Sequence, residues 1–266
     1  MIAFEGASVT AQTADGAVTI LHPTTLTLAE RRVSVIGANG SGKSTLARLI
    51  NGLVEPSAGS VTVRPGAAGG DAQRRTEGTA GEGGALDTVR DGPAVRRAVG
   101  FVFTDPSAQL IMPTAAEDVA LSLRRTHRDK RERRAAAVDA LDRFGLADLA
   151  DRSVHALSGG QKQMLAIASV LAAGPSVLVA DEPTTLLDLR NSRRVGDLLF
   201  SLPQQLVLVT HDLELAARAD RTLVVEQGRV VFDGDPASAI ADYRARSAAD
   251  ARDARSPWDR PPGETP

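Results

Sequence analysis

A glycine-rich segment near the start of the chain reads Gly37-Ala38-Asn39-Gly40-Ser41-Gly42-Lys43-Ser44. It follows the apolar, β-rich run 33–36 and opens the segment 44–52, whose apolar residues have helical spacing. This is the phosphate-loop pattern, in which glycines let successive backbone N–H groups converge on phosphate oxygens at a helix N-terminus. In this pattern Lys43 reaches the β- and γ-phosphates and the Ser44 hydroxyl binds Mg²⁺. The alternative is a glycine-rich turn that only packs, but the strand before the loop and the helix after it favour phosphate binding.

Two continuous apolar runs, 176–180 and 206–210, lie further along the chain. Neither run alternates with polar residues, which is typical of strands buried on both faces of a parallel sheet. A helical pattern separates them, so the order is βαβ and the sequence predicts an α/β fold with a mostly parallel central sheet. Short β-rich runs over 1–36 predict further strands, and 223–232 predicts a hairpin with a glycine turn.

The composition excludes several classes of protein. The 266 residues carry 33 acids and 31 bases, so the charge gives no electrostatic reason to expect binding to nucleic acid. Cysteine is absent from the sequence, which excludes disulfides, thiolate zinc sites and a catalytic thiol. No run approaches the roughly 18 uncharged apolar residues of a membrane span, and residues 1–10 lack the pattern of a secretory signal. We therefore expect a cytoplasmic protein whose membrane contact, if any, is peripheral.

Two regions are poor in large apolar side chains. The segment 64–95 consists mainly of Gly, Ala, Arg and Asp, so we expect a flexible insertion that cannot bury enough surface to offset its ordering entropy. From 244 to 266 the chain is rich in Ala, Asp, Arg and Pro, which predicts a disordered tail. The sequence therefore predicts one domain over 1–243 that contains the insertion.

An acidic pair, Asp181-Glu182, directly follows the run 176–180. A carboxylate at the C-terminal end of a central parallel strand lies where open α/β sheets bind their ligands. Asp181 can then hold Mg²⁺, and Glu182 is placed to take a proton from an attacking water. An acidic pair that caps a helix is the alternative, but the phosphate loop in the same chain favours the catalytic interpretation.

A second glycine-bearing helix start reads Leu157-Ser158-Gly159-Gly160-Gln161. Ser158 can act as an N-cap, and the two glycines leave backbone N–H groups uncovered, which predicts a second anion site. The motif precedes the acidic pair by about twenty residues, and His211 follows the run 206–210. This arrangement closely resembles the ATP-binding cassette (ABC) family over roughly residues 1–240.

The resemblance implies an ABC-type nucleotide-binding fold with an antiparallel N-terminal part and a helical subdomain that carries the signature Ser158 to Gln161. It implies that ATP is bound by Gly37, Ala38, Asn39, Gly40, Ser41, Gly42, Lys43, Ser44, Thr45, Ser158, Gly159, Gly160 and Gln161. Ser44 and Asp181 would hold Mg²⁺, and Glu182 would be the catalytic base. His211 takes the place of the switch histidine that contacts the γ-phosphate, and Thr185 stands where the family usually has a serine. The other histidines, His22, His127 and His155, have no spacing that suggests a metal.

The resemblance also implies partners. In this family two cassettes face each other head to tail, so that the phosphate loop of one and the signature of the other enclose each ATP. One chain with one set of motifs implies a dimer, with itself or with a similar ABC ATPase subunit. The family further implies a transmembrane coupling subunit, a substrate-binding membrane subunit and a peripheral position on the cytoplasmic face of the membrane.

The sequence departs from the family pattern at two places. Thr104 stands where the family usually has a glutamine, so any contact with a magnesium-bound water would have a shorter reach; Gln109 lies five residues later. Ala11, followed by Gln12, stands where an aromatic side chain normally stacks on adenine. We therefore expect weak stacking on the base.

The run 103–120 resembles the energy-coupling-factor branch of importers, which take up vitamins and transition-metal ions. Thr104 together with Met112-Pro113-Thr114 is most similar to biotin-transport ATPases, and a cobalt or nickel ion is the alternative cargo. The main rival is a soluble ABC ATPase of DNA repair or chromosome maintenance, but the long heptad insertion of those proteins is absent from the sequence. A translation factor would need two cassettes in one chain, and a small-molecule kinase would leave 157–161 without a role.

Overall fold

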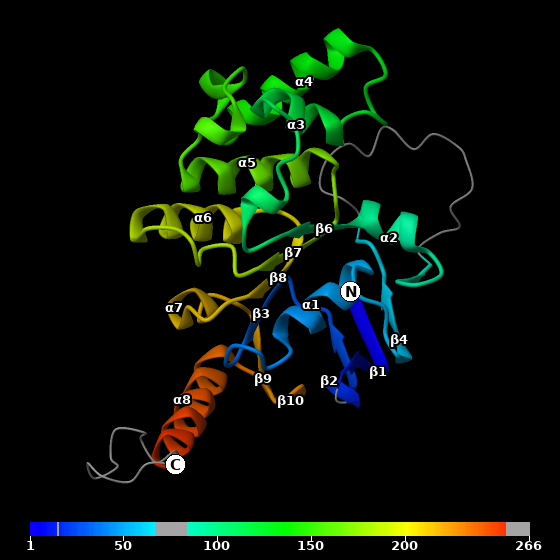
Figure 1. The fold of residues 1–266 in the computed structure, drawn as a ribbon, viewed down its shortest axis with the longest axis vertical. Helices are drawn as coiled ribbons and strands as arrows, with labels where there is room; N and C mark the ends of the chain where they lie inside the picture. Colours follow the sequence, from blue (N-terminus) through cyan, green and yellow to red (C-terminus); the bar gives the residue numbers. More distant parts are fainter. Residues whose placement is uncertain (15, 67–83, 254–266) are drawn as a thin grey trace.

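The computed structural model describes residues 1–14, 16–66 and 84–253, which form two sheets and a helical part (Figure 1). The strands are β1 (Ile2–Thr13), β2 (Gly16–Leu28), β3 (Arg32–Ile36), β4 (Ala58–Val63), β5 (Leu86–Asp87), β6 (Val99–Val102), β7 (Val177–Asp181), β8 (Gln205–Val209), β9 (Arg221–Glu226) and β10 (Arg229–Gly234). The helices are α1 (Lys43–Asn51), α2 (Gly92–Ala98), α3 (Ala115–Ser122), α4 (Lys130–Asp142), α5 (Gly159–Ala172), α6 (Leu189–Ser201), α7 (Leu213–Ala216) and α8 (Pro236–Asp253). In Figure 1 the helical part with α3, α4 and α5 lies at one end of the molecule and α8 at the other.

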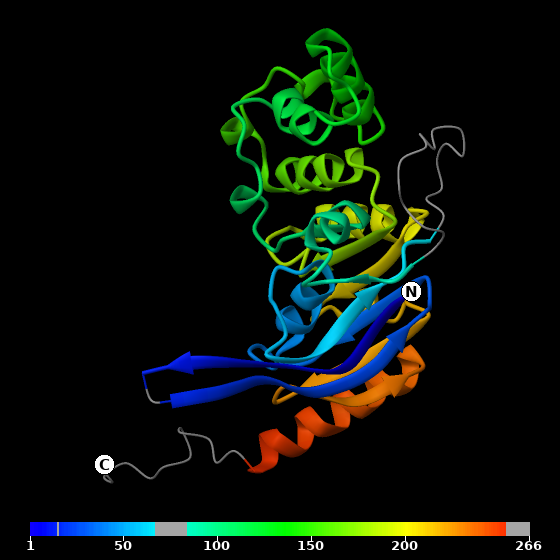
Figure 2. The ribbon, with the colours of Figure 1, turned by 90° about the vertical axis from the view of Figure 1, so that its right-hand side faces the viewer.

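The two sheets differ in strand direction. The larger has the order β10-β9-β3-β8-β7-β6, and all its pairings except that of β9 with β10 are parallel. The smaller, β2-β1-β4-β5, is antiparallel throughout. Figure 2 shows the β1–β2 hairpin extending out from the body of the molecule. These features confirm the predicted α/β class with a mostly parallel central sheet, an antiparallel N-terminal part and a helical subdomain.

Strand β7 is buried on both faces, as its unbroken apolar run predicted. Val177 and Val179 contribute to a core shared with α1 and the antiparallel sheet. The alternate residues Leu178 and Ala180 contribute to a second core, shared with the helical part. Because side chains alternate along a strand, one strand joins both cores, and its C-terminal carboxylate is carried on a rigid support.

A buried carboxylate organises the helical part. Asp118 on α3 accepts hydrogen bonds from the backbone N–H groups of Ile111 and Met112, at 2.9 and 3.1 Å. Its other oxygen accepts from the Ser169 hydroxyl on α5, at 2.9 Å. One side chain thereby connects the loop before α3 with α5, the helix whose first turn carries the signature motif.

The expectation of a flexible insertion over 64–95 is wrong for residues 84–95, which include β5 and the start of α2. A local turn forms here, since Oδ1 of Asp87 accepts hydrogen bonds from the N–H groups of both Val89 and Arg90, at 2.9 Å each. Val95 is fully buried in the main core. Composition failed here because a few well-placed apolar side chains anchor a segment that is polar on average. Residues 67–83 lie outside the described part of the chain.

The expectation of a disordered tail from residue 244 is wrong for 244–253, which belong to α8. The helix is anchored earlier, where Ala239 and Ile240 are buried against the sheet and Tyr243 packs on the same cluster. Arg246 then bonds Asp242 one turn before it, at 2.6 Å, and pairs with Glu226 of β9, at 3.6 Å. The Ala-rich sequence continues a helix that packing has already started, and residues 254–266 lie outside the described part.

None of the described helices is both long enough and apolar enough to cross a membrane.

Candidate functional site

The glycine-rich loop connects β3 to α1 in a conformation that requires glycine. Gly37 and Gly42 have φ angles of 148° and 103°, and a Cβ at Gly37 would lie 2.1 Å from the Val225 carbonyl oxygen. Among the described residues, none accepts a hydrogen bond from the N–H groups of Lys43, Ser44 and Thr45. The Ser41 hydroxyl is buried and likewise has no partner among the described residues. The loop therefore presents several free donors at a helix N-terminus, which fits a phosphate group.

Lys43 folds back over this loop. Its Nζ donates to the carbonyl oxygens of Gly37 and Ala38, at 2.9 and 2.8 Å, and the residue is only 5% exposed. Burial lowers the pKa of the Lys43 ammonium, while the nearby carboxylates of Glu182 and Asp181 act in the opposite direction. The ammonium is thus already removed from most of the solvent and held where an anion in the loop would meet it.

Asp181 faces the start of α1 from the end of β7. Its Oδ1 accepts from the Ser44 hydroxyl at 2.8 Å, and its Oδ2 lies 3.5 Å from the guanidinium of Arg48. Burial raises the pKa of the Asp181 carboxyl, against the effects of Ser44 and Arg48. A hydroxyl and a carboxylate this close form the hard oxygen pair that Mg²⁺ prefers, so the residues fit the expected metal. Arg48 was not predicted as a site residue, although it lies four residues after Ser44 on the same face of the helix.

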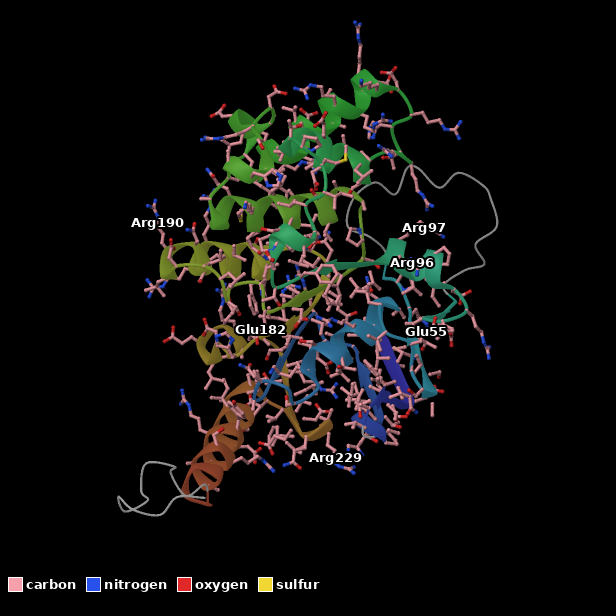
Figure 3. The ribbon with its side chains drawn as sticks, in the orientation of Figure 1. Glu55, Arg96, Arg97, Glu182, Arg190 and Arg229 are labelled. Carbon is pink, nitrogen blue, oxygen red and sulfur yellow. The ribbon has the colours of Figure 1, made fainter. Side chains whose placement is uncertain are left out.

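Glu182 follows Asp181 in a turn at the end of the same strand. Its φ is 53°, and its N–H donates to the Val209 carbonyl at 2.9 Å. Its Oε2 accepts from the Thr185 hydroxyl at 2.8 Å and lies 2.6 Å from Nδ1 of His211. Figure 3 places Glu182 in the middle of the molecule, where the helical part meets the larger sheet. Its Oε1 has no hydrogen-bond partner in the part of the chain described, so this oxygen is free to accept a proton.

Thr104 and Gln109, which both follow β6, contact different groups. The Thr104 hydroxyl donates to the Asp181 carbonyl oxygen at 2.9 Å, so Thr104 lies at the site but is held on the main chain. The Gln109 amide bonds the backbone of Phe101 and Phe103 instead, at 3.3 Å each, and closes the end of β6. Gln109 therefore does not replace the glutamine that the family pattern expects at 104.

The signature Ser158 to Gln161 forms a capped helix start. The Ser158 hydroxyl accepts from the N–H of Gln161 at 3.3 Å, and the Gln161 side chain accepts from the N–H of Ser158 at 2.9 Å. The N–H groups of Gly159 and Gly160 bond no acceptor among the described residues. Helix α5 lies in the helical part, apart from α1 beside the sheets (Figure 1). The structure thus gathers 37–45, Thr104, the acidic pair and His211, and leaves the signature elsewhere in the same chain.

The main chain of β2 passes beside the phosphate loop, and Ala11 lies on the neighbouring strand β1. Ala11 of β1 pairs with Val18 of β2, and Val18 and Ile20 are 50% and 36% exposed. A Cβ at Gly42 would lie 3.0 Å from the Ile20 carbonyl oxygen, so β2 passes directly beside the start of α1.

The remaining histidines join no group of three or more potential metal ligands within the described residues.

Comparison with known proteins agrees with this geometry. Residues 21–185, more than half of the chain, match the family model described as "ABC transporter". The chain is 42% identical to the biotin transport ATP-binding protein BioM of Rhizobium etli over 247 residues, which cover 93% of this chain and 99% of the relative. It superposes on cbiO1 of Clostridium perfringens, part of the ABC transporter complex cbiONQ, with a TM-score of 0.72, 29% identity and 94% of each chain covered. A dimeric post-hydrolysis structure of the ATP-binding cassette MJ0796, bound to ADP and Pi, gives a TM-score of 0.73 at 28% identity, covering 89% of this chain and 99% of that one.

Proposed function

The chain belongs to the ABC transporter family, and we propose that it is the ATP-hydrolysing subunit of an energy-coupling-factor importer whose cargo is biotin. The observation that carries the choice of cargo is the 42% identity to a biotin transport ATP-binding protein across nearly the whole of both chains. The family membership supports ATP as the substrate, and the loop with its free N–H donors supports the same conclusion.

Each residue of the site has a role in this proposal. Lys43 turns from the carbonyls of Gly37 and Ala38 to the phosphates, which the N–H groups of Lys43, Ser44 and Thr45 also bind. Ser44 and Asp181 hold Mg²⁺, which when bound neutralises charge on the phosphate oxygens.

Glu182 is the residue we propose as general base. Its carboxylate is oriented by Thr185 and His211, so that the free oxygen Oε1 takes the proton of the attacking water. His211, 58% exposed in its side chain, is accessible to the γ-phosphate from the solvent side.

The signature 158–161 completes the site of a second chain. It lies apart from the phosphate loop of its own chain, and its unbonded N–H groups face no partner among the described residues. We therefore propose a head-to-tail pair of this chain with itself or with a similar ABC ATPase; the MJ0796 cassette, to which the chain is similar, is also dimeric. The same proposal places the pair on the cytoplasmic face of the membrane, bound to a transmembrane coupling subunit and a substrate-binding membrane subunit.

Purification from detergent-solubilised membranes tests this function. We expect a tagged chain to carry its untagged membrane partners, identified by mass spectrometry, and the reconstituted complex to accumulate biotin in vesicles only with ATP. A Glu182→Gln complex serves as the control without hydrolysis. Accumulation of Co²⁺ or Ni²⁺ instead of biotin would contradict the cargo, and a chain that carries no membrane protein would contradict the importer.

Nucleotide selectivity provides a further prediction. Because Ala11 stands where the family usually has an aromatic side chain and pairs with Val18 across the hairpin, we expect ATP, GTP and CTP to bind within about tenfold of one another. Ala11→Tyr should tighten purine nucleotides by about 1–3 kcal/mol, the value of one base–aromatic stack. Competition titrations against a fluorescent nucleotide measure both effects, with Ala11→Leu as a control that adds volume but no ring. Strong preference for ATP in the unmodified protein would show that another group reads the base.

A further inference from the structure

One side chain of α6 contacts the signature motif. Gly160 is buried, and a Cβ at this position would lie only 2.6 Å from both Cγ and Oδ1 of Asn191. At the neighbouring Gly159 a Cβ would make ordinary contacts, 3.9 Å from the Leu186 carbonyl oxygen and from Leu187. The first turn of α5 is thus in direct contact with the amide of Asn191, and glycine at 160 is what allows the contact.

Asn191 is itself fixed at both its main chain and its side chain. The N–H of Asn191 donates to Oδ1 of Asp188 at 2.8 Å, and its side-chain amide donates to Oδ2 of the same carboxylate at 2.9 Å. Asp188 is the N-cap of α6, so this double contact defines where the helix begins. The amide is therefore held in one orientation against Gly160.

The same short segment leads back to the acidic pair. Leu187 donates its N–H to the Thr184 carbonyl at 3.1 Å, and Thr185 bonds the Glu182 carboxylate at 2.8 Å. Residues 182–191 thus form one hydrogen-bonded segment, with Glu182 at one end and Asn191 at the other. The three atoms nearest to a Cβ at the buried Gly160 all belong to Asn191, the last residue of this segment.

We propose that Asn191 is a positioning residue, which sets the orientation of the signature turn 158–161 relative to the Glu182 carboxylate of the same chain. The inference rests on the proposed head-to-tail pair. There Glu182 acts on the ATP in its own phosphate loop, whereas the signature of that chain closes on the ATP of its partner. Asn191 then connects the two ATP sites, because it fixes the signature turn of one site relative to the Glu182 carboxylate of the other.

The test uses the full chain with Glu182→Gln as the parent, in which ATP drives pairing without turnover. Asn191→Ala removes the amide but keeps the backbone cap. We expect it to weaken ATP-driven pairing about tenfold in analytical ultracentrifugation, with nucleotide affinity of the unpaired chain unchanged. Ser192→Ala is the matched control. The Ser192 hydroxyl donates to the carbonyl oxygens of Thr184 and Leu187 in the same segment, but none of the three atoms nearest to a Cβ at Gly160 belongs to Ser192. We expect this control to pair within about twofold of the parent.

A double-mutant cycle separates positioning from general destabilisation. Gly160→Ala should impair pairing strongly in the parent and at least about tenfold less in the Asn191→Ala chain, because the new Cβ no longer meets the amide. Equal effects of Gly160→Ala in both backgrounds, or normal pairing of Asn191→Ala, would overturn the positioning role of Asn191. Neither result would affect the proposed head-to-tail arrangement. A parent that does not pair with ATP would overturn the proposed head-to-tail arrangement and this inference with it.

Discussion

Glu182→Gln is expected to lower ATP hydrolysis by about a hundredfold or more, while ATP binding is retained. The amide keeps the size of the side chain and a partner for Thr185, but it cannot take a proton from water. The site loses its proton acceptor and keeps every group that contacts phosphate. Steady-state phosphate release and nucleotide titration on the same preparation measure the two quantities.

Glu214→Gln provides the matched control for this variant, because Glu214 is an exposed carboxylate on α7, which follows the neighbouring strand β8. We expect its turnover to equal that of the unmodified protein. Near-normal turnover of Glu182→Gln in a preparation free of contaminating ATPase would remove Glu182 from the role of base.

Lys43→Ala should weaken nucleotide binding itself, by about 3 kcal/mol or roughly a hundredfold. The ammonium is already buried and held by the carbonyls of Gly37 and Ala38, so a phosphate gains a charge-assisted contact with little further desolvation. Isothermal titration with ATP measures the loss, and a melting curve checks that the loop still folds.

Lys130→Ala is the control for charge, because Lys130 is exposed at the start of α4 in the helical part. Its ATP affinity should match that of the unmodified chain. Unchanged ATP affinity in Lys43→Ala would contradict the assignment of the phosphate loop.

Much of the fold and part of the site could be predicted from local patterns. The unbroken apolar runs identified β7 and β8, because a strand buried on both faces needs apolar side chains at every position. The order strand, glycine loop, helix located Lys43 and Ser44, and the acidic pair after β7 located Asp181 and Glu182. The structure brings these side chains together because parallel strands end at one edge of the sheet.

Contacts between distant segments could not be predicted in the same way. The ion pair of Arg48 with Asp181 and the bond from Thr104 to the Asp181 carbonyl depend on how α1, β6 and β7 meet in space. Residues 244–253 of α8 and residues 84–95 were mistaken for flexible segments because average composition does not register single anchors such as Val95 or Ile240.

The central claim is that two chains enclose each ATP, and a mixing experiment tests it most directly. Ser158→Arg should block a signature and Lys43→Ala a phosphate loop, so each homodimer has two defective sites. A heterodimer of the two variants has one site that combines an intact phosphate loop with an intact signature. We predict that the mixture hydrolyses ATP well above either variant alone, once heterodimers are demonstrated by differential tagging. Hydrolysis in the mixture no higher than in either parent, with heterodimers present, would contradict the account.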